Sequence, residues 1–213
     1  MVTENSYKIR THHKNLFLRV LKGHFATSHS HINYYIDVTT QKARLSEASA
    51  VAKELVSFYR SNTIVDTILC LDGTEVIGTC LAEELTKADF VNMNAHQTIY
   101  VVTPEHTVGS QLIFRDNMVP MIEGKHVLIL AASVSTGYTA NAAVEAINYY
   151  GGHVAGISAI FATISDCAGY KVHSVFNPND IDGYFSCPSH ECPLCKNKKK
   201  IDALVNSFGY SEL

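Results

Sequence analysis

The sequence predicts an α/β fold: a central, mainly parallel sheet flanked by helices. Short apolar runs typical of buried strands alternate with longer amphipathic segments typical of helices, and this order recurs in both halves of the 213-residue chain. Strands that alternate with helices form parallel sheets, because each helix returns the chain to the same end of the sheet. We expect a single domain over residues 1–213, with its core at about 34–176. Residues 1–33 and the Cys-containing tail 177–213 are expected to be peripheral and to form a small hood.

The first half of the chain contains six predicted elements. These are a helix at 13–21, a strand at 34–39, a helix at 46–60, a strand at 68–71, a helix at 77–86 and a strand at 98–102. Ser46 opens the second helix, and Glu47 is favourable to its dipole. Residues 103–121 lack a clear period and contain Pro104 and Pro120, which predicts a long loop or hairpin of the kind that often forms a lid.

The second half repeats the alternation. A strand at 126–131 is followed by a tight turn, a helix at 139–150 that stops at Gly151 and Gly152, and a strand at 154–161. A further strand is predicted at 172–176 and a short helix at 201–208.

The composition excludes several classes of protein. Hydrophobic residues make up 46% of the chain, charged residues 17%, and the net charge is −3. These values match an ordinary soluble globule and offer no basic field for nucleic acid. Residues 1–10 hold no apolar core of signal-peptide length, and no run approaches the roughly 18 apolar residues of a membrane span. We therefore expect a cytoplasmic protein with no nucleic-acid or membrane partner.

The most informative segment is the turn after the strand 126–131. It consists of Ser135, Thr136, Gly137, Tyr138 and Thr139. Hydroxyl groups and backbone N–H groups at the start of a helix bind phosphate, and glycine permits close approach of the backbone. A plain strand-to-helix turn is the alternative interpretation.

Three motifs together resemble the landmarks of type I phosphoribosyltransferases, particularly orotate phosphoribosyltransferases, over roughly residues 13–163. They are His24-Phe25 with Tyr34-Tyr35-Ile36-Asp37, Gly73-Thr74-Glu75-Val76-Ile77-Gly78, and Ser135-Thr136-Gly137-Tyr138-Thr139. Cys192-Pro193-Leu194-Cys195 is similar to a Cys-Pro-Leu-Cys sequence near the end of some bacterial members. The resemblance implies that the turn grips the 5′-phosphate of phosphoribosyl pyrophosphate or of a nucleotide monophosphate. We also expect a homodimer, with Tyr149 and Tyr150 as candidate packing or dimer contacts.

A second loop resembles the pyrophosphate loop of that family. It contains Asp72, Gly73, Thr74 and Glu75, and the two glycines Gly73 and Gly78 would let the backbone approach a ligand. The carboxylates of Asp72 and Glu75 would repel pyrophosphate unless a divalent metal such as Mg²⁺ stood between them. An ordinary turn is the alternative.

Charged groups typical of active family members are missing. The resemblance implies two adjacent acids that hold the ribose hydroxyls, and Ala131 and Ala132 occupy those positions. Losing two charge-assisted hydrogen bonds costs roughly 3 to 6 kcal/mol. Residues 103–121 contain no lysine, so His106 and Arg115 are the remaining catalytic candidates in the lid. An arginine expected to face orotate falls at Thr163.

Two functions remain open for this fold. One is an enzyme that transfers phosphoribose to a nitrogenous base with Mg²⁺, weakened by the missing acids. The other is a nucleotide-sensing or regulatory subunit that has kept the phosphate turn without catalysis. A third class, a redox or metal-dependent interaction module, rests on the tail alone.

The tail places three thiols and an imidazole within nine residues. Cys187, His190, Cys192 and Cys195 have the composition of a tetrahedral zinc site. It is sterically hard for so short a segment to supply four ligands, so a distant residue or a neighbouring subunit could replace Cys187 or His190. Reduced, metal-free surface thiols are the alternative. Cys70 and Cys80 lie in apolar runs and are expected to be buried thiols. The N-terminal histidines, which include His24, His29 and His31, are interpreted as solvated side chains.

Overall fold

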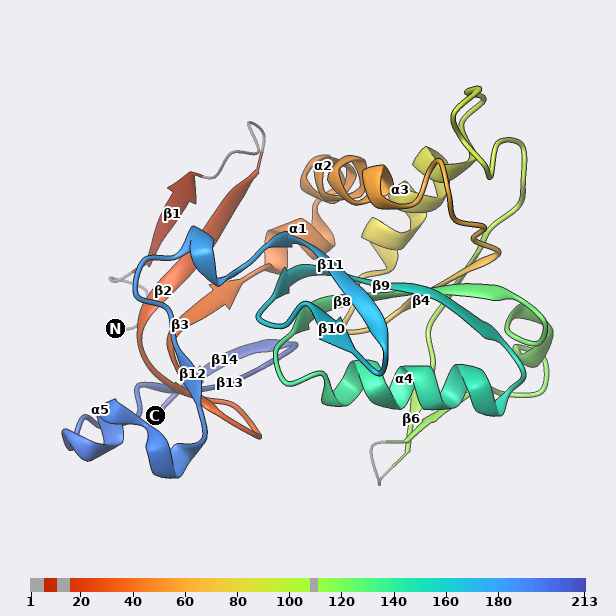
Figure 1. Ribbon diagram of the computed structural model, residues 1–213. Coiled ribbons are helices and arrows are strands. Elements are labelled where there is room, and N and C mark those ends of the chain that lie inside the picture. Colours follow the sequence, from red (N-terminus) through yellow and green to blue (C-terminus); the bar gives the residue numbers. More distant parts are fainter. Residues whose placement is uncertain (1–5, 11–15, 108–110) are drawn as a thin grey trace. The chain divides into compact units, whose positions relative to one another are not determined.

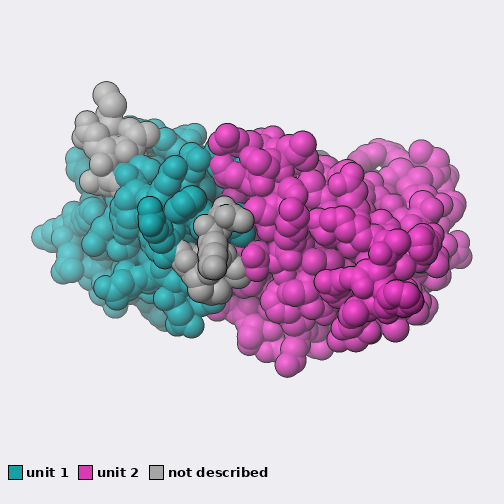
Figure 2. Space-filling model, turned by 90° about the horizontal axis from the view of Figure 1, so that it is seen from above, with its two compact units in different colours: residues 1–40, 176–213 teal, residues 41–175 magenta. Residues whose placement is uncertain are grey.

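The computed structural model describes residues 6–10, 16–107 and 111–213, and it divides the chain into two compact units (Figure 2). Unit 1 consists of residues 1–40 and 176–213, and unit 2 of residues 41–175. The two segments that we expected at the periphery therefore come together as a unit with a sheet and an apolar core of its own.

Unit 2 contains a six-stranded sheet of order β10-β11-β9-β8-β4-β5 (Figure 1). The strands are β4 (Thr67–Cys70), β5 (Tyr100–Val102), β8 (His126–Val134), β9 (His153–Ala162), β10 (Asp166–Cys167) and β11 (Tyr170–Phe176). β4 runs parallel to β5 and β8, β8 runs parallel to β9, and β10 and β11 form an antiparallel pair. The mainly parallel sheet flanked by helices is confirmed.

Helices cover both faces of this sheet. α2 and α3 lie on one face and α4 on the other (Figure 1). The helical segments of unit 2 and its preceding turn are α1 (Thr39–Ala43), α2 (Leu45–Leu55), η2 (Val56–Phe58), α3 (Glu75–Thr86), η3 (Val119–Met121) and α4 (Tyr138–Tyr149). Residues 103–121 contain a short antiparallel hairpin, β6 (Glu105–His106) and β7 (Leu112–Ile113), in agreement with the expected loop or hairpin.

The core of unit 2 forms around β8. Its residues from Val127 to Ala132 are all buried, as is usual for a central parallel strand covered on both faces. Ile129 and Ala131 share one apolar cluster with Ala143 and Ile147 of α4. On α3, Gly78 lets the helix approach β4, since a Cβ there would collide with Sγ of Cys70. β8 therefore packs against α4, and its neighbour β4 packs against α3.

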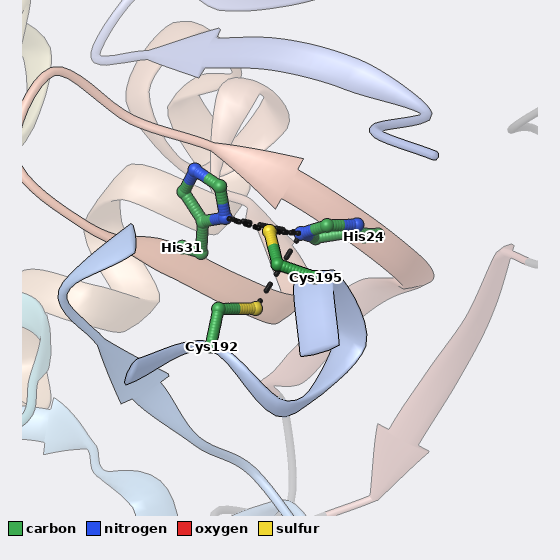
Figure 3. A group of neighbouring side chains, drawn as sticks. All are labelled: His24, His31, Cys192 and Cys195. Carbon is green, nitrogen blue, oxygen red and sulfur yellow. Dashed lines mark hydrogen bonds between the residues drawn. The ribbon is translucent and has the colours of Figure 1, made fainter. Parts of the chain in front are cut away.

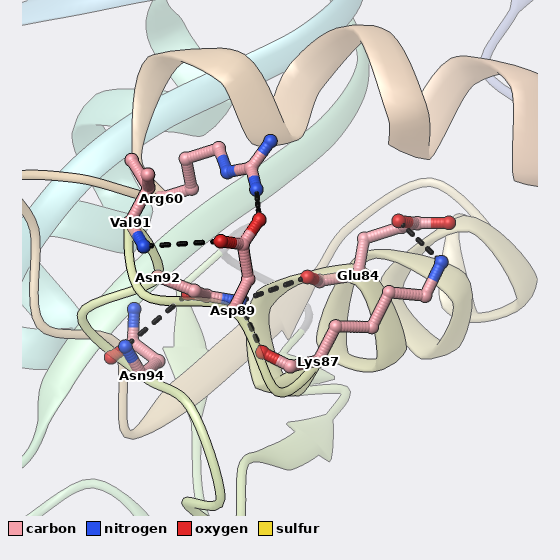
Figure 4. A network of polar contacts seen from close by, with 7 residues as sticks. All are labelled: Arg60, Glu84, Lys87, Asp89, Val91, Asn92 and Asn94. Carbon is pink, nitrogen blue, oxygen red and sulfur yellow. Dashed lines mark hydrogen bonds and ion pairs between the residues drawn. The ribbon is translucent and has the colours of Figure 1, made fainter.

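The connection from α3 to β5 is held by side-chain amides (Figure 4). Asn92 Nδ2 donates to the carbonyl oxygens of Glu84 and Lys87, both at 3.2 Å. Asn94 Nδ2 donates to the carbonyl oxygen of Thr63 at 2.9 Å, and its Oδ1 accepts from the backbone N–H of Val65. The two buried asparagines therefore fix a loop that has no regular structure of its own.

Unit 1 contains a second sheet of order β12-β3-β2-β13-β14, with β1 paired to β2. Its strands are β1 (Ser6–Arg10), β2 (Phe17–Ala26), β3 (His31–Asp37), β12 (Ser186–Cys187), β13 (Ala203–Asn206) and β14 (Gly209–Glu212), and its helical turns are η4 (Pro178–Asp180), η5 (Ser189–Glu191) and α5 (Pro193–Lys196). β13 runs parallel to β2, so the end of the chain adds a strand to the N-terminal hairpin. Phe25, Ile32, Tyr35 and Ala203 belong to its small core.

Two predicted helices were wrong. The helix at 13–21 is β2, although residues 11–15 lie outside the described residues, and the helix at 201–208 is the β13–β14 hairpin. In both segments burial alternates with period two: Leu18 and Val20 are buried on either side of a more exposed Arg19, and Leu204 is exposed between two buried residues. A short apolar run is compatible with either a helix or a strand, and in these two segments pairing within the sheet selected the strand.

Within the described part of the chain, no helix combines the length and apolar character that crossing a membrane requires.

Candidate functional site

The loops that follow β4 and β8 lie at one edge of the parallel sheet. Cys70 of β4 is opposite Leu130 of β8, and the backbone N–H of Leu71 continues the pairing by donating to the carbonyl oxygen of Leu130 at 2.8 Å. Both predicted loops therefore lie at the carboxyl ends of neighbouring parallel strands, where open α/β sheets bind ligands.

The turn at residues 135–139, predicted to bind phosphate and called the phosphate turn below, exposes its polar side chains. Ser135, Thr136 and Thr139 are exposed, whereas Gly137 is buried with φ of 77°, a left-handed conformation that favours glycine. Gly137 is the N-cap of α4, no side chain caps this helix, and its first turn contains no acidic residue. The positive end of the helix dipole is therefore available to an anion.

Two residues that follow β9 in the chain, Thr163 and Cys167, form hydrogen bonds with the backbone of the phosphate turn. Thr163, directly after β9, donates its hydroxyl to the carbonyl oxygen of Ser135 at 2.8 Å, and its N–H donates to Val134 at 2.9 Å. The thiol of Cys167 donates to the carbonyl oxygen of Gly137 at 3.4 Å. A Cβ at Gly137 would lie 2.9 Å from that sulfur. Cys167 thus packs so closely against Gly137 that this position has no room for a larger side chain.

The second loop is fixed by a lysine that the sequence analysis missed. Lys42 of α1 donates from Nζ to the carbonyl oxygen of Asp72 at 2.7 Å, and both Asp72 and Gly73 have positive φ. Thr74 is buried and donates to the carbonyl oxygens of Leu71 and Leu130. A cation is therefore close to this loop, and it comes from α1, which precedes the loop in sequence, and not from residues 103–121, where cations were sought.

The alanines that replace the acidic pair are both buried. Ala131 and Ala132 are each 2% exposed, and Ala131 packs in the apolar cluster beneath α4. Neither side chain offers a polar atom to a sugar.

The cation of the hairpin already has a partner. Arg115 donates from Nε and Nη2 to the carboxylate of Glu105, at 2.9 and 2.6 Å. Hydrogen bonding to Arg115 lowers the pKa of Glu105, and the same contact raises the pKa of Arg115. His106 lies beside Glu105 on β6 and is exposed. The guanidinium of Arg115 is therefore paired with the carboxylate of Glu105.

Unit 1 holds a cluster of side chains that could bind a metal ion (Figure 3). His24 lies near the end of β2 and His31 at the start of β3, across the turn that joins these strands, and Cys192 and Cys195 come from the tail around α5. In Figure 3 a nitrogen of each ring is turned towards the other ring, and both thiols point towards them. One ligand atom from each residue, two imidazole nitrogens and two sulfurs, lies within 4.8 Å of the others.

Individual distances within the cluster are shorter. Nε2 of His24 lies 3.1 Å from Nδ1 of His31, 3.5 Å from Sγ of Cys192 and 3.6 Å from Sγ of Cys195. Sγ of Cys195 lies 3.3 Å from Nδ1 of His31. Of the four ligands proposed from the sequence, the structure brings in Cys192 and Cys195. His190 instead lies against Glu191 at 3.4 Å, and both are exposed.

The assignment of His24 and His31 as solvated side chains was wrong, because both are buried. His29, in the turn between them, is exposed as expected. The two ligands were hard to recognise because the pairing of β2 with β3 and the return of the tail create the cluster, and neither is a local feature. Cys187 lies next to the cluster, with its sulfur 3.9 Å from the carbonyl oxygen of His31.

No family model matches this sequence, and no curated protein matches it either. Solved structures do. Orotate phosphoribosyltransferase of Mycobacterium tuberculosis H37Rv in complex with Fe(III) dicitrate has a TM-score of 0.54 at 16% identity, over 78% of this chain and 93% of that one. The same enzyme with 5-phospho-alpha-D-ribosyl 1-diphosphate has a TM-score of 0.51 at 15% identity, over 69% and 82%. Adenine phosphoribosyltransferase of Leishmania tarentolae has 0.50 at 16%, over 70% and 78%.

Proposed function

We propose that this chain, which has the fold of the type I phosphoribosyltransferases, binds a nucleotide or another phosphoribosyl ligand by its 5′-phosphate at the turn formed by residues 135–139. The observation that carries the proposal is the geometry of this turn. It sits at the carboxyl edge of the sheet, its hydroxyl groups are exposed, and it leads into a helix whose N-terminus has no acid and no side-chain cap. One of the similar structures contains a phosphoribosyl diphosphate.

We further propose that phosphoribosyl transfer is strongly weakened or lost. Catalysis needs groups that stabilise the charge that develops in the transition state. Ala131 and Ala132 supply none, and Arg115 is engaged by Glu105. Mg²⁺ is part of the proposal only for a diphosphate ligand, for which the carboxylates of Asp72 and Glu75 are the candidate protein ligands. The remaining function is recognition of the ligand, as in a nucleotide-sensing or regulatory subunit.

The test of binding is a calorimetric titration with UMP, OMP, AMP and phosphoribosyl pyrophosphate. The double variant Thr136→Ala, Thr139→Ala removes two exposed hydroxyls without changing the core. A hydrogen bond to a charged group contributes about 1.5 to 3 kcal/mol, so we expect the affinity to fall at least tenfold. Ser57→Ala, an exposed hydroxyl on η2, is the control and should bind like the wild type. Absence of binding by all four ligands would refute the proposal.

The test of catalysis is pyrophosphate release from phosphoribosyl pyrophosphate, with Mg²⁺ and a panel of purine and pyrimidine bases. We expect ligand binding without turnover above the rate of a reaction lacking protein. Base-dependent release that survives purification would show that other residues perform the transfer, and the regulatory alternative would then be abandoned.

We also propose a homodimer. Tyr150 is occupied within the chain, since its hydroxyl accepts from the backbone N–H of Phe114 and their rings pack edge to face. Tyr149 is 83% exposed and is the better candidate contact. Light scattering on the wild type and on Tyr149→Ser measures the mass directly, and a monomeric wild type would exclude the dimer.

A further inference from the structure

We infer that His24, His31, Cys192 and Cys195 bind one Zn²⁺ ion, which fastens the tail to the β2–β3 hairpin of unit 1. The site is independent of the phosphate turn, and either proposal stands if the other fails. Four properties of the cluster support it: the spacing of the ligand atoms, the fixed orientation of His24, the conformation around Cys192, and the charge of the ligand set.

The spacing matches a tetrahedral ion. Ligands placed about 2.0 Å (nitrogen) and 2.3 Å (sulfur) from a common zinc lie roughly 3.3 to 3.8 Å from one another. Four of the six distances among these atoms run from 3.1 to 3.6 Å, and all six lie within 4.8 Å. If the four side chains formed two separate hydrogen bonds, each ligand atom would lie close to one partner. Here Nε2 of His24 lies within 3.6 Å of all three other ligand atoms.

The tautomer of His24 is set by the tail. Its Nδ1 lies 2.9 Å from the carbonyl oxygen of Lys199 and 3.1 Å from that of Lys200. Carbonyl oxygens only accept, so Nδ1 carries the proton and Nε2 presents its lone pair to the cluster. Backbone carbonyls commonly orient metal-bound histidines in this way. Because the same ring is 0% exposed, its lone pair cannot turn to solvent instead.

The local backbone also brings Cys192 and Cys195 together. Pro193 begins the short helix α5 directly after Cys192, and Cys195 lies in that helix. Cys192 is 0% exposed. This turn returns the chain so that the thiol of Cys195 reaches the same point as that of Cys192, which is the geometry of a zinc knuckle.

The charges of the ligand set balance a divalent ion. On binding, each thiol releases one proton, and both histidines bind as neutral imidazoles. Two thiolates then neutralise Zn²⁺, so that the buried site carries no net charge. Mixed sulfur and nitrogen ligands in a tetrahedron favour zinc over magnesium or calcium, which prefer oxygen.

The first experiment measures the metal in the full chain. Protein purified without chelators should contain about one zinc per chain, and X-ray absorption of that sample should give two sulfur and two nitrogen neighbours. Less than a tenth of an equivalent, both as purified and after reconstitution with Zn²⁺, would overturn the inference. A first shell of four sulfurs, or one containing oxygen, would overturn this ligand set. Neither readout depends on a variant that has to fold.

Variants identify the ligands. We expect Cys192→Ser, Cys195→Ser and His24→Ala to reduce bound Co²⁺ or Zn²⁺ at least tenfold, with far-ultraviolet circular dichroism recording whether each remains folded. His190→Ala is the matched control, because His190 lies in the same segment but outside the cluster, and this variant should bind metal like the wild type. Loss of metal in the His190 variant with retention in the His24 variant would transfer the site to the tail alone.

Limited trypsin digestion tests the structural role. The tail contains Lys196, Lys198, Lys199 and Lys200, and the carbonyl groups of the last two are bonded to His24. Removing the metal should release this segment and speed cleavage there at least tenfold, and adding Zn²⁺ should restore protection. Cleavage at an unchanged rate after verified metal removal would contradict the role of the ion in fastening the tail.

Discussion

The hydroxyl of Thr163 donates a 2.8 Å hydrogen bond to the carbonyl oxygen of Ser135, and so connects the end of β9 to the phosphate turn that follows β8. Thr163 occupies the position at which we expected an arginine facing orotate. In this chain the residue instead forms a hydrogen bond with the backbone of the phosphate turn. The orientation of the turn therefore depends on the neighbouring strand as well as on its own sequence.

Replacing Thr163 by valine keeps the shape of the side chain and removes this bond. A neutral hydrogen bond contributes about 0.5 to 1.5 kcal/mol, so we expect nucleotide monophosphates to bind roughly two- to tenfold more weakly by calorimetry. Thr163→Ser retains the hydroxyl and should restore most of the affinity. Equal affinities of the valine and serine variants would show that the bond does not position the turn.

Gly137→Ala should damage the turn in two separable ways. The residue has φ of 77°, and an added Cβ would lie 2.9 Å from Sγ of Cys167. Gly169 has φ of 83° but nothing within 4 Å of an added Cβ. Gly169→Ala therefore measures the backbone cost alone, about 1 to 2 kcal/mol. We expect Gly137→Ala to lower the free energy of unfolding by more than this, and to abolish ligand binding.

A second substitution tests why Gly137→Ala should lower the free energy of unfolding by more than Gly169→Ala does. Adding Cys167→Ala to Gly137→Ala removes the sulfur that the new Cβ would approach. Urea unfolding of the single and double variants should then show a coupling energy that favours the double variant. Strictly additive effects would mean that the conflict lies elsewhere.

The sequence predicted the α/β sheet well because its strands and helices are local patterns. The run from Val127 to Ala132 is apolar on both faces, and the turn at Gly137 follows directly from it. Unit 1 was predicted poorly. Leu18 pairs with Ile9 of β1 and Leu204 with Ala26 of the distant strand β2, so sheet pairing decided the period of both short apolar segments. Sheet register is a long-range property, and composition alone does not specify it.

The same distinction explains the sites. Cys192 and Cys195 are two residues of one motif and were recognised, whereas His24 and His31 join them only after β2 and β3 have paired and the tail has returned. Lys42 was missed for a similar reason, since its contact with Asp72 spans 30 residues.

The opposite edge of the sheet provides a pH-dependent contact that leaves the phosphate turn untouched. Oδ2 of Asp66 accepts from the backbone N–H of His126 at 2.8 Å and lies 2.9 Å from Nδ1 of the same residue. Burial raises the pKa of Asp66, but the hydrogen bonds and charge of His126 outweigh it, so that the pKa falls below its ordinary value of 3.8. The ionised carboxylate is thus favoured by folding.

The sign follows from this shift. Asp66 stabilises the fold fully above its ordinary pKa, and the contribution is lost as the pH falls through the lower pKa of the folded state. Asp66→Asn should therefore flatten the acid limb of the stability profile below about pH 5, measured by urea unfolding. Glu123→Gln, at an exposed position, is the control and should leave the limb unchanged. An identical acid limb in Asp66→Asn would contradict the proposed contribution.

Lys42→Met distinguishes the contributions of the two loops at the carboxyl edge of the sheet to ligand binding. The substitution removes the Nζ that donates to the carbonyl oxygen of Asp72 and takes a positive charge from a loop that carries Asp72 and Glu75. A diphosphate at that loop should lose a charge-assisted contact of about 1.5 to 3 kcal/mol. We expect phosphoribosyl pyrophosphate to bind at least tenfold more weakly, while nucleotide monophosphates, which need only the turn at Gly137, change less than twofold. Lys53→Met, on the exposed side of α2, controls for net charge. Equal losses for both ligand classes would mean that Lys42 supports the whole edge of the sheet, and that the Asp72 loop does not select for a diphosphate.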